Sequence, residues 1–192
     1  CKKVVFDEKI KDRWYFIQQC LDQPHGDSSF IPTSTLAEEF ARYSKVVLTG
    51  DGGDEIFGGY SRYFKAIESY SNDIELFESY FNDISIFSDS DISKFSTPFL
   101  ISYLNDYHDD CKDMFNDTSL TCPFNKLMNY DMKTILPNNN LIKPDRMGMR
   151  HSIEARNPLI DYRLAEKSFT FKKFNNNYQP KEPLSISVSY TH

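Results

Sequence analysis

The stretch V-V-L-T-G-D-G-G-D-E-I-F-G-G-Y, residues 46–60, is the most informative part of the sequence. A short β-branched run enters a turn that contains glycines with acidic and hydroxyl side chains, and a helix-like stretch leaves it. Glycines let the backbone approach a ligand closely, but carboxylates repel phosphate unless a hard cation such as Mg²⁺ lies between them. The loop therefore predicts metal-nucleotide chemistry, although Asp and Gly also dominate ordinary turns.

Two further blocks give this loop a context. One reads Y-D-M-K-T-I-L-P-N-N-N-L-I-K-P-D-R-M-G-M-R-H-S-I-E-A-R-N-P-L-I-D at residues 130–161, and the other reads H-G-D-S-S-F-I-P-T at residues 25–33. Neither of the common phosphate loops, G-x-x-x-x-G-K-S/T and G-x-G-x-x-G, occurs in the chain.

Together the three blocks resemble the synthetase domain of the asparagine synthase (glutamine-hydrolysing) family. The loop is similar to that family's S-G-D/E-G-x-D-E-x-F-G-G-Y segment, and the block at 130–161 to its D-x-x-x-Y-L-P-x-x-x-L-x-K-x-D-R-x-x-M-x-x-S-x-E-x-R-x-P-x-L-D segment. The upstream block resembles its D-x-S-x-I-P stretch. Because the three blocks keep the family's order and spacing, we expect a family member.

The fold class that the resemblance implies is α/β and mostly helical. It is a partial adenine-nucleotide α-hydrolase-like (ATP pyrophosphatase) domain with a short parallel sheet. We expect this domain over residues 1–184 and treat residues 185–192 as an uncertain tail. The β-branched run predicts a short buried strand at 45–49, with the acidic loop at its carboxyl end, where open parallel sheets bind ligands. By the same resemblance, central strands that the family has and this sequence lacks would leave residues 46–48 without a neighbour.

Four local signals predict helix boundaries. Thr35 and Glu38 have the spacing of a capping box, followed by an apolar stripe of Leu36, Phe40 and Tyr43. Pro137 and the asparagines after it are expected to break a helix. Pro144 then opens the next helix, and Asp161 caps the last one.

Composition and charge limit the classes of partner that the chain can bind. The chain has 192 residues and a net charge of -6, which argues against a nucleic-acid partner. No apolar run approaches the roughly 20 residues that cross a bilayer, so no membrane partner is expected. Its 4 cysteines contain no C-x-x-C pair, which favours reduced cytosolic thiols. We therefore expect a cytoplasmic protein.

The loop supplies the first group of candidate residues. By resemblance, Asp54 binds the metal and pyrophosphate, whereas Thr49 and Gly50, with Gly52 beside them, bind the adenylate. Asp51 stands where some family members have a Glu that takes a proton from the attacking ammonia, and it is one methylene shorter. Each acidic side chain is alternatively a solvated turn or helix N-terminal residue. The resemblance adds two further candidate catalytic residues, Glu55 and Tyr60.

A second group lies downstream: Lys143, Asp145, Arg146, Glu154 and Arg156. These side chains could pair with the carboxylate, ammonium and phosphates of the substrates. Glu154 and Arg156 could equally form a buried structural ion pair. Lys181 resembles a family lysine that stabilises the transition state, although the sequence after it departs from the family.

The resemblance implies an ATP- and Mg²⁺-dependent, AMP-forming conversion of aspartate to asparagine through a β-aspartyl adenylate. Ammonia would come from glutamine by an N-terminal glutaminase domain of the same full-length chain, and a homodimer is one assembly that the family allows. The family's upstream S-G-G-x-D-S loop is absent here, so we expect the chain alone not to make asparagine. The alternatives are a relative that adenylates another carboxylate, such as a β-lactam-forming synthetase, and a non-catalytic remnant or interaction module.

Overall fold

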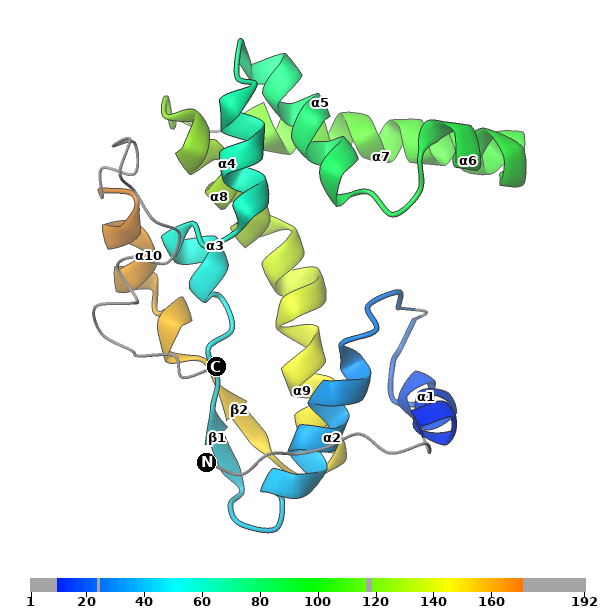
Figure 1. The fold of residues 1–192 in the computed structure, drawn as a ribbon, viewed down its shortest axis with the longest axis vertical. Helices are drawn as coiled ribbons and strands as arrows, with labels where there is room; N and C mark the ends of the chain where they lie inside the picture. The colour runs from blue at the N-terminus through cyan, green and yellow to red at the C-terminus, as the bar shows by residue number, and fades with distance from the viewer. Residues whose placement is uncertain (1–9, 24, 117–118, 171–192) are drawn as a thin grey trace. The chain divides into compact units, whose positions relative to one another are not determined.

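The computed structural model describes residues 10–23, 25–116 and 119–170, and these residues form a mostly helical chain (Figure 1). The longer helices are α1 (Ile10–Gln18), α2 (Phe30–Phe40), α4 (Ser61–Glu68), α5 (Asp73–Ile84), α7 (Pro98–Asn116), α8 (Pro123–Lys133) and α9 (Ile142–Arg150). Shorter ones are α3 (Gly53–Phe57), α6 (Asp89–Phe95) and α10 (Tyr162–Ser168). The described residues divide into two compact units. Unit 1 runs up to Gly53 and resumes over Lys133–Glu166, and unit 2 comprises Asp54–Met132 with the residues from Lys167 on.

A two-stranded parallel sheet lies in unit 1. Strand β1 (Val46–Leu48) pairs with β2 (Glu154–Arg156) in the register Val46 to Glu154, and the Thr49 N–H extends the ladder by donating to the Arg156 carbonyl at 2.9 Å. The expected strand is therefore present, but it has a neighbour and is not buried, since Leu48 is 71% exposed. The expected short parallel sheet is confirmed. The lone strand was wrong because sequence about a hundred residues away supplies its neighbour, and the expected burial was wrong because the outer residues of β1 are exposed.

Helix α2 packs against α9 in unit 1. Phe30 and Met147 meet there, together with Ile17 of α1, in a small buried core. Gly148 permits the turn from α9 into β2, because a Cβ at this position would lie 2.9 Å from the carbonyl oxygen of Ile153.

The predicted start of α2 was wrong. The helix begins at Phe30, so Thr35 lies in its interior, where its hydroxyl donates to the Ile31 carbonyl at 3.0 Å instead of capping the helix. Leu36 and Phe40, placed on the inner stripe, are exposed. The D-x-S segment before the helix determines the start, since Asp27 accepts from the Ser29 N–H at 2.8 Å and closes a local turn.

The predicted break after α8 was also wrong. Pro137 and the asparagines lie in a π-helical turn (Leu136–Asn140) that leads into α9. Proline is tolerated there because it occupies the first turn of this element, where its missing N–H is not needed. Two other boundaries are confirmed. Pro144 lies in the first turn of α9, and Asp161 caps α10 by accepting from the Arg163 N–H at 2.9 Å.

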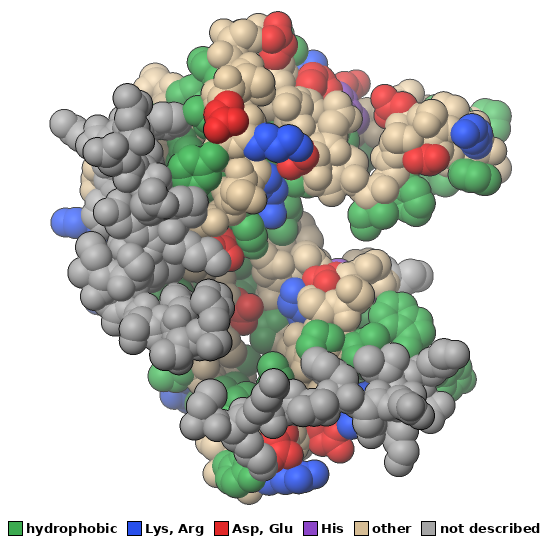
Figure 2. Space-filling model, in the orientation of Figure 1, with side chains coloured by type: hydrophobic (Ala, Val, Ile, Leu, Met, Phe, Trp, Pro, Cys, Tyr) green, Lys and Arg blue, Asp and Glu red, His purple; other side chains and the backbone are tan. Residues whose placement is uncertain are grey.

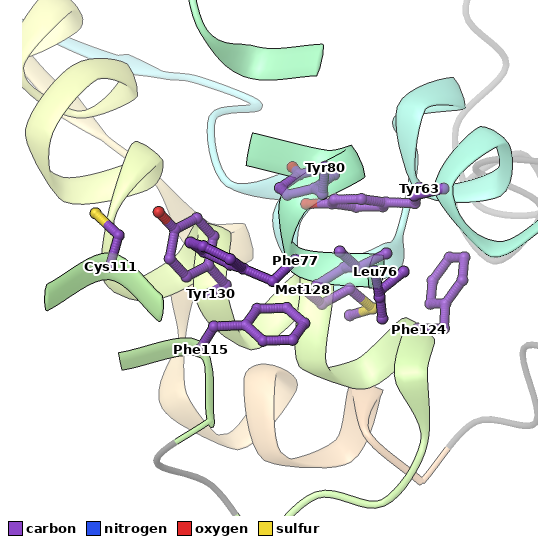
Figure 3. Packing of buried hydrophobic residues seen from close by; sticks show 11 residues of the cluster. Tyr63, Leu76, Phe77, Tyr80, Cys111, Phe115, Phe124, Met128 and Tyr130 are labelled. Atoms are coloured by element: carbon purple, nitrogen blue, oxygen red, sulfur yellow. The ribbon is translucent and has the colours of Figure 1, made fainter. Parts of the chain in front are cut away.

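Unit 2 is built around an aromatic core between α4, α5, α7 and α8 (Figure 3). Phe77, Tyr80 and Phe115 are fully buried there, and Tyr130 packs edge-on against all three. Gly58, between α3 and α4, has φ +68°, and a Cβ there would lie 2.4 Å from a ring carbon of Phe124.

Other large side chains of unit 2 are exposed, notably along α6 and α7, where Figure 2 shows hydrophobic side chains at the surface. Phe95 and Phe99 are both more than four-fifths exposed. In the described part of the chain, no helix is both long and apolar enough to span a bilayer.

Candidate functional site

The loop after β1 begins with a hydroxyl that contacts two side chains. The Thr49 hydroxyl donates to the Asp51 carboxylate at 2.7 Å and also contacts the Oδ1 of Asn157, just beyond β2. The carboxyl ends of both strands therefore contribute to one polar cluster in unit 1. This cluster orients the Asp51 carboxylate at the edge of the sheet where parallel strands place ligands.

Two glycines of this loop play different parts. Gly52 has φ +84°, and a Cβ there would lie 2.2 Å from Cγ2 of Ile160, so the fold itself requires glycine. Among the described residues, a Cβ at Gly50 would meet no atom within 4 Å. Packing against them therefore does not require glycine at position 50, and the missing side chain leaves the backbone there accessible.

The loop continues into helix α3, whose first turn carries Asp54 and Glu55. Asp54 is half-buried, whereas Glu55 is buried and accepts a hydrogen bond from the Tyr60 hydroxyl at 2.6 Å. Burial raises the pKa of Tyr60 well above its ordinary value, and the hydrogen bond to Glu55 raises it further. The Tyr60 phenol is thus kept protonated as a hydrogen-bond donor.

Lys143 of α9 lies in a second polar cluster of unit 1. Its ammonium donates to Asp27 at 2.9 Å and to the Ser29 hydroxyl at 2.7 Å, and the amide of Asn139 donates to Asp27 at 3.3 Å. Burial would raise the pKa of Asp27, but the hydrogen bonds from Ser29 and Lys143 outweigh it and lower that pKa well below the usual range. Asp27 is therefore a carboxylate throughout the physiological range.

The other downstream candidates lie at the surface. Asp145 is in the first turn of α9, and Arg146 contacts Asp22. Arg156 donates to Glu154 at 2.9 Å along β2, and both side chains are more than half exposed. The buried ion pair considered for Glu154 and Arg156 is therefore wrong, because alternate residues of a strand lie on one face and here that face is open. Lys181 lies outside the described residues.

The structure brings together three pairs of the candidate residues: Thr49 with Asp51, Glu55 with Tyr60, and Glu154 with Arg156. It also adds side chains that the candidate set lacked, namely Asp27, Ser29 and Asn157. The signal for Asp27 and Ser29 was present in the D-x-S block, but nothing in the sequence indicated that Lys143 was their partner.

Among the described residues, no three His, Cys, Asp or Glu side chains gather into a preformed metal centre. The loop offers single hard oxygen donors instead. Mg²⁺ in nucleotide sites is commonly bound by one or two carboxylates with the remaining ligands from phosphates and water, so the donor chemistry of Asp54 fits that ion.

The mostly helical chain with a short parallel sheet and a glycine-rich acidic loop at the strand ends agrees with the adenine-nucleotide α-hydrolase-like class, to which the matching family's domain belongs. The family model described as asparagine synthase matches residues 4–173. The chain belongs to the asparagine synthase family. The expected family and fold class are both confirmed.

Individual relatives agree with this assignment. Asparagine synthetase (glutamine-hydrolyzing) 1 of Bacillus subtilis strain 168 is 27% identical over 184 residues, which cover 81% of this chain and 28% of that protein. Putative asparagine synthetase (glutamine-hydrolyzing) 2 of Methanocaldococcus jannaschii is 45% identical over 53 residues, covering 28% of this chain and 10% of the relative. A putative asparagine synthetase (glutamine-hydrolyzing) of Mycobacterium tuberculosis strain H37Rv is 44% identical over 50 residues, covering 26% and 7%.

The matched part of the chain thus spans 28% of the length of the Bacillus subtilis relative and 10% of that of the Methanocaldococcus jannaschii relative. No solved structure matches it significantly.

Proposed function

We propose that this chain contributes to the conversion of aspartate to asparagine within a larger ATP-dependent, AMP-forming ligase. The observation that carries the proposal is the loop after β1, where no described side chain lies against Gly50 beside the Thr49–Asp51 pair. Membership of the asparagine synthase family supports asparagine synthesis as the reaction that this loop serves. Aspartate would attack the α-phosphate of ATP to form a β-aspartyl adenylate and pyrophosphate, and ammonia would then displace AMP.

The loop residues have separate roles in this proposal. Gly50 and Gly52 give the adenylate access to the backbone, and the Thr49 hydroxyl orients the Asp51 carboxylate. Asp51 then accepts a proton from the attacking ammonia, for which a carboxylate within hydrogen-bond reach is suited. Glu55 and Tyr60 lie at the intermediate, and Lys181 stabilises charge that develops in the transition state.

Asp54 would bind Mg²⁺ together with phosphate oxygens. The metal, when bound, neutralises the charge that develops on pyrophosphate as it leaves. Lys143, Asp145, Arg146, Glu154 and Arg156 supply cationic and anionic groups for the substrates' carboxylate, ammonium and phosphates. Lys143 is held in place for this by Asp27 and Ser29.

The partners follow from the same proposal. They are aspartate, ATP and ammonia, with glutamine as its source, and a glutaminase domain in the same full-length polypeptide. Residues 1–184 form the synthetase part, and we further propose a cytoplasmic protein able to form a homodimer.

Aspartate-dependent exchange of labelled pyrophosphate into ATP tests the proposal. We expect no exchange with the 192-residue chain alone and clear exchange with the longest protein that its gene encodes. In that protein Asp54→Asn should abolish the exchange, whereas Asp83→Asn, which removes a surface partner of Lys65, should not. Absence of exchange in the longest protein, or equal exchange with other carboxylates, would contradict the proposal.

A further inference from the structure

A carboxylate with unusual surroundings lies at the centre of unit 2. Asp131, on α8, is completely buried, and its Oδ2 alone accepts from three donors. These are Arg62 at 2.7 Å, the Tyr63 hydroxyl at 2.6 Å and the Tyr80 hydroxyl at 2.7 Å. The carboxylate therefore joins α8 to α4 and α5 at a single point.

The guanidinium of Arg62 makes a second set of contacts within unit 2, with Tyr60 and Tyr80. Its Cζ lies 3.5 Å from the centroid of the Tyr60 ring, and its Nε donates to the Tyr80 hydroxyl at 2.8 Å. A guanidinium is planar and has donors in fixed directions, so binding Asp131 and Tyr80 determines the orientation of its plane. That plane in turn forms one wall for the ring of Tyr60.

Tyr63 forms another wall, since its ring meets the Tyr60 ring edge-on with centroids 5.5 Å apart. Both walls are hydrogen-bonded to Asp131. With its ring placed in this way, Tyr60 directs its hydroxyl to Glu55, whose carboxylate accepts at 2.6 Å. A continuous series of contacts thus runs from the buried carboxylate on α8 to the candidate catalytic pair.

We propose that Asp131 and Arg62 are positioning residues that hold the Tyr60 phenol against Glu55. The inference rests on the proposed function for the catalytic role of Tyr60 and Glu55, but the positioning can be measured without activity. Neither Asp131 nor Arg62 touches the reacting groups in this view, and both act through Tyr60.

A purely structural ion pair would behave differently. Such a pair can often be replaced by neutral groups without loss of stability, and nothing else need change. If the pair positions Tyr60, its replacement should instead release the phenol from Glu55 even while the unit stays folded. The charged and titratable groups that act on Tyr60 are Glu55, Arg62 and Asp54, so the change can be followed through the ionisation of Tyr60 itself.

Two variants test this from different sides. Arg62→Lys keeps a cation for Asp131 but has no plane to place against Tyr60. The double variant Arg62→Gln with Asp131→Asn removes both charges, so no uncompensated buried charge remains. Lys65→Gln on the same helix is the matched control, because Lys65 pairs with Asp83 at the surface.

The readout is the ionisation of Tyr60 in protein labelled with carbon-13 at tyrosine Cζ, assigned by comparison with Tyr60→Phe. The charge of Arg62 lowers the pKa of Tyr60, so loss of that charge alone would raise it. Release of the phenol from Glu55 and into water would lower it toward the ordinary value of about 10. We expect Tyr60 to ionise near that pH in both variants, but not in the wild type or the control.

If Tyr60 stays protonated in either folded variant as it does in the wild type, the proposal is overturned. Unfolding of both variants at neutral pH would overturn it as well, because the pair would then be needed for folding and not for the placement of one phenol.

The longest encoded protein gives a second readout in pyrophosphate exchange. There we expect Arg62→Lys to lower kcat by up to about 100-fold, as small misplacements of catalytic groups do, with the KM for ATP little changed. If the wild type shows no exchange but Tyr60 ionises near pH 10 in the variants alone, the proposed function is refuted and the positioning stands. If the wild type shows exchange but Tyr60 ionises no differently in the variants, the positioning is refuted and the proposed function stands.

Discussion

Two carboxylates, one half-buried in unit 1 and one fully buried in unit 2, are bound to cations in contrasting ways. Asp27 in unit 1 uses both oxygens: Oδ1 accepts from the backbone and hydroxyl of Ser29, and Oδ2 accepts from Lys143 and Asn139. Asp131 in unit 2 receives all three of its donors on Oδ2, and its Oδ1 is buried without a hydrogen-bond partner in the described structure.

The difference shows what each carboxylate does for its surroundings. Two of the four bonds to Asp27 come from a residue two positions away, so Asp27 shapes a local turn before α2 as well as holding Lys143. Asp131 bonds only to residues far away in the sequence, and its effect is to join three helices. Because Asp131 is fully buried, water cannot take the place of its carboxylate as a hydrogen-bond acceptor if the side chain is removed.

The largest effect is therefore expected at Asp131. Asp131→Ala should lower the free energy of unfolding of unit 2 by about 3–5 kcal/mol, because the cation and two phenols lose their common acceptor in the interior. Urea denaturation followed by near-ultraviolet tyrosine absorbance measures this, since the core of unit 2 is rich in tyrosine. If Asp27→Ala lowered the free energy of unfolding of unit 1 by as much as Asp131→Ala lowers that of unit 2, the contrast between the two carboxylates would be wrong.

Next in size should be a change in the loop of unit 1. Gly52→Ala places a side chain on a left-handed backbone, which costs about 1–2 kcal/mol, and pushes Ile160 aside as well. Gly50→Ala is the control, since its Cβ would meet no atom of the residues that the structure describes. The chain's one tryptophan, Trp14, lies in unit 1, so its fluorescence can follow the urea denaturation of that unit. We expect a lower free energy of unfolding for Gly52→Ala and no change for Gly50→Ala. Equal losses for both variants would show that the loop is not packed as described.

A smaller and pH-dependent effect is expected at Asp27. Its pKa is lower in the folded protein than the ordinary 3.8, so the stability it contributes is present above pH 4 and is lost as the pH falls below that value. The stability difference between wild type and Asp27→Asn, measured by Trp14 fluorescence, should therefore be constant near neutral pH and shrink in acid. A difference that grows as the pH falls would mean that the sign is wrong.

The smallest effect should come from the exposed pair on β2. Arg156→Gln should change stability by less than about 1 kcal/mol, because both partners are solvated and water screens their attraction. Sodium chloride should weaken even this difference. If Arg156→Gln destabilised unit 1 as strongly as Gly52→Ala, the pair would have to be more buried than it is here.

Much of this architecture could be predicted from the sequence where the signal was local. The strand at β1, the first turn of α9 and the Asp161 cap each depend on a few neighbouring residues, and each is confirmed. Thr35 and Glu38 misled because capping-box residues also occur inside helices, and the competing D-x-S turn lay only a few residues upstream.

Long-range pairings could not be predicted in the same way. Nothing near Val46 identifies Glu154 as its partner, and nothing near Tyr60 indicates that Arg62 would connect it to Asp131. The loop stood out because its glycines and carboxylates adjoin one another in the sequence. The roles of its residues in catalysis stay predictions.

The parallel pairing of β1 with β2 also has a consequence for the order in which the protein folds. The two strands are separated by the whole of Asp54–Met132, and closing so long a loop costs conformational entropy that grows with its length. Contacts between residues distant in sequence form slowly, whereas the helices of the intervening segment can form through nearby contacts. We therefore expect refolding to begin within the inserted helices and the two-stranded sheet, with the nucleotide loop at its edge, to be completed last.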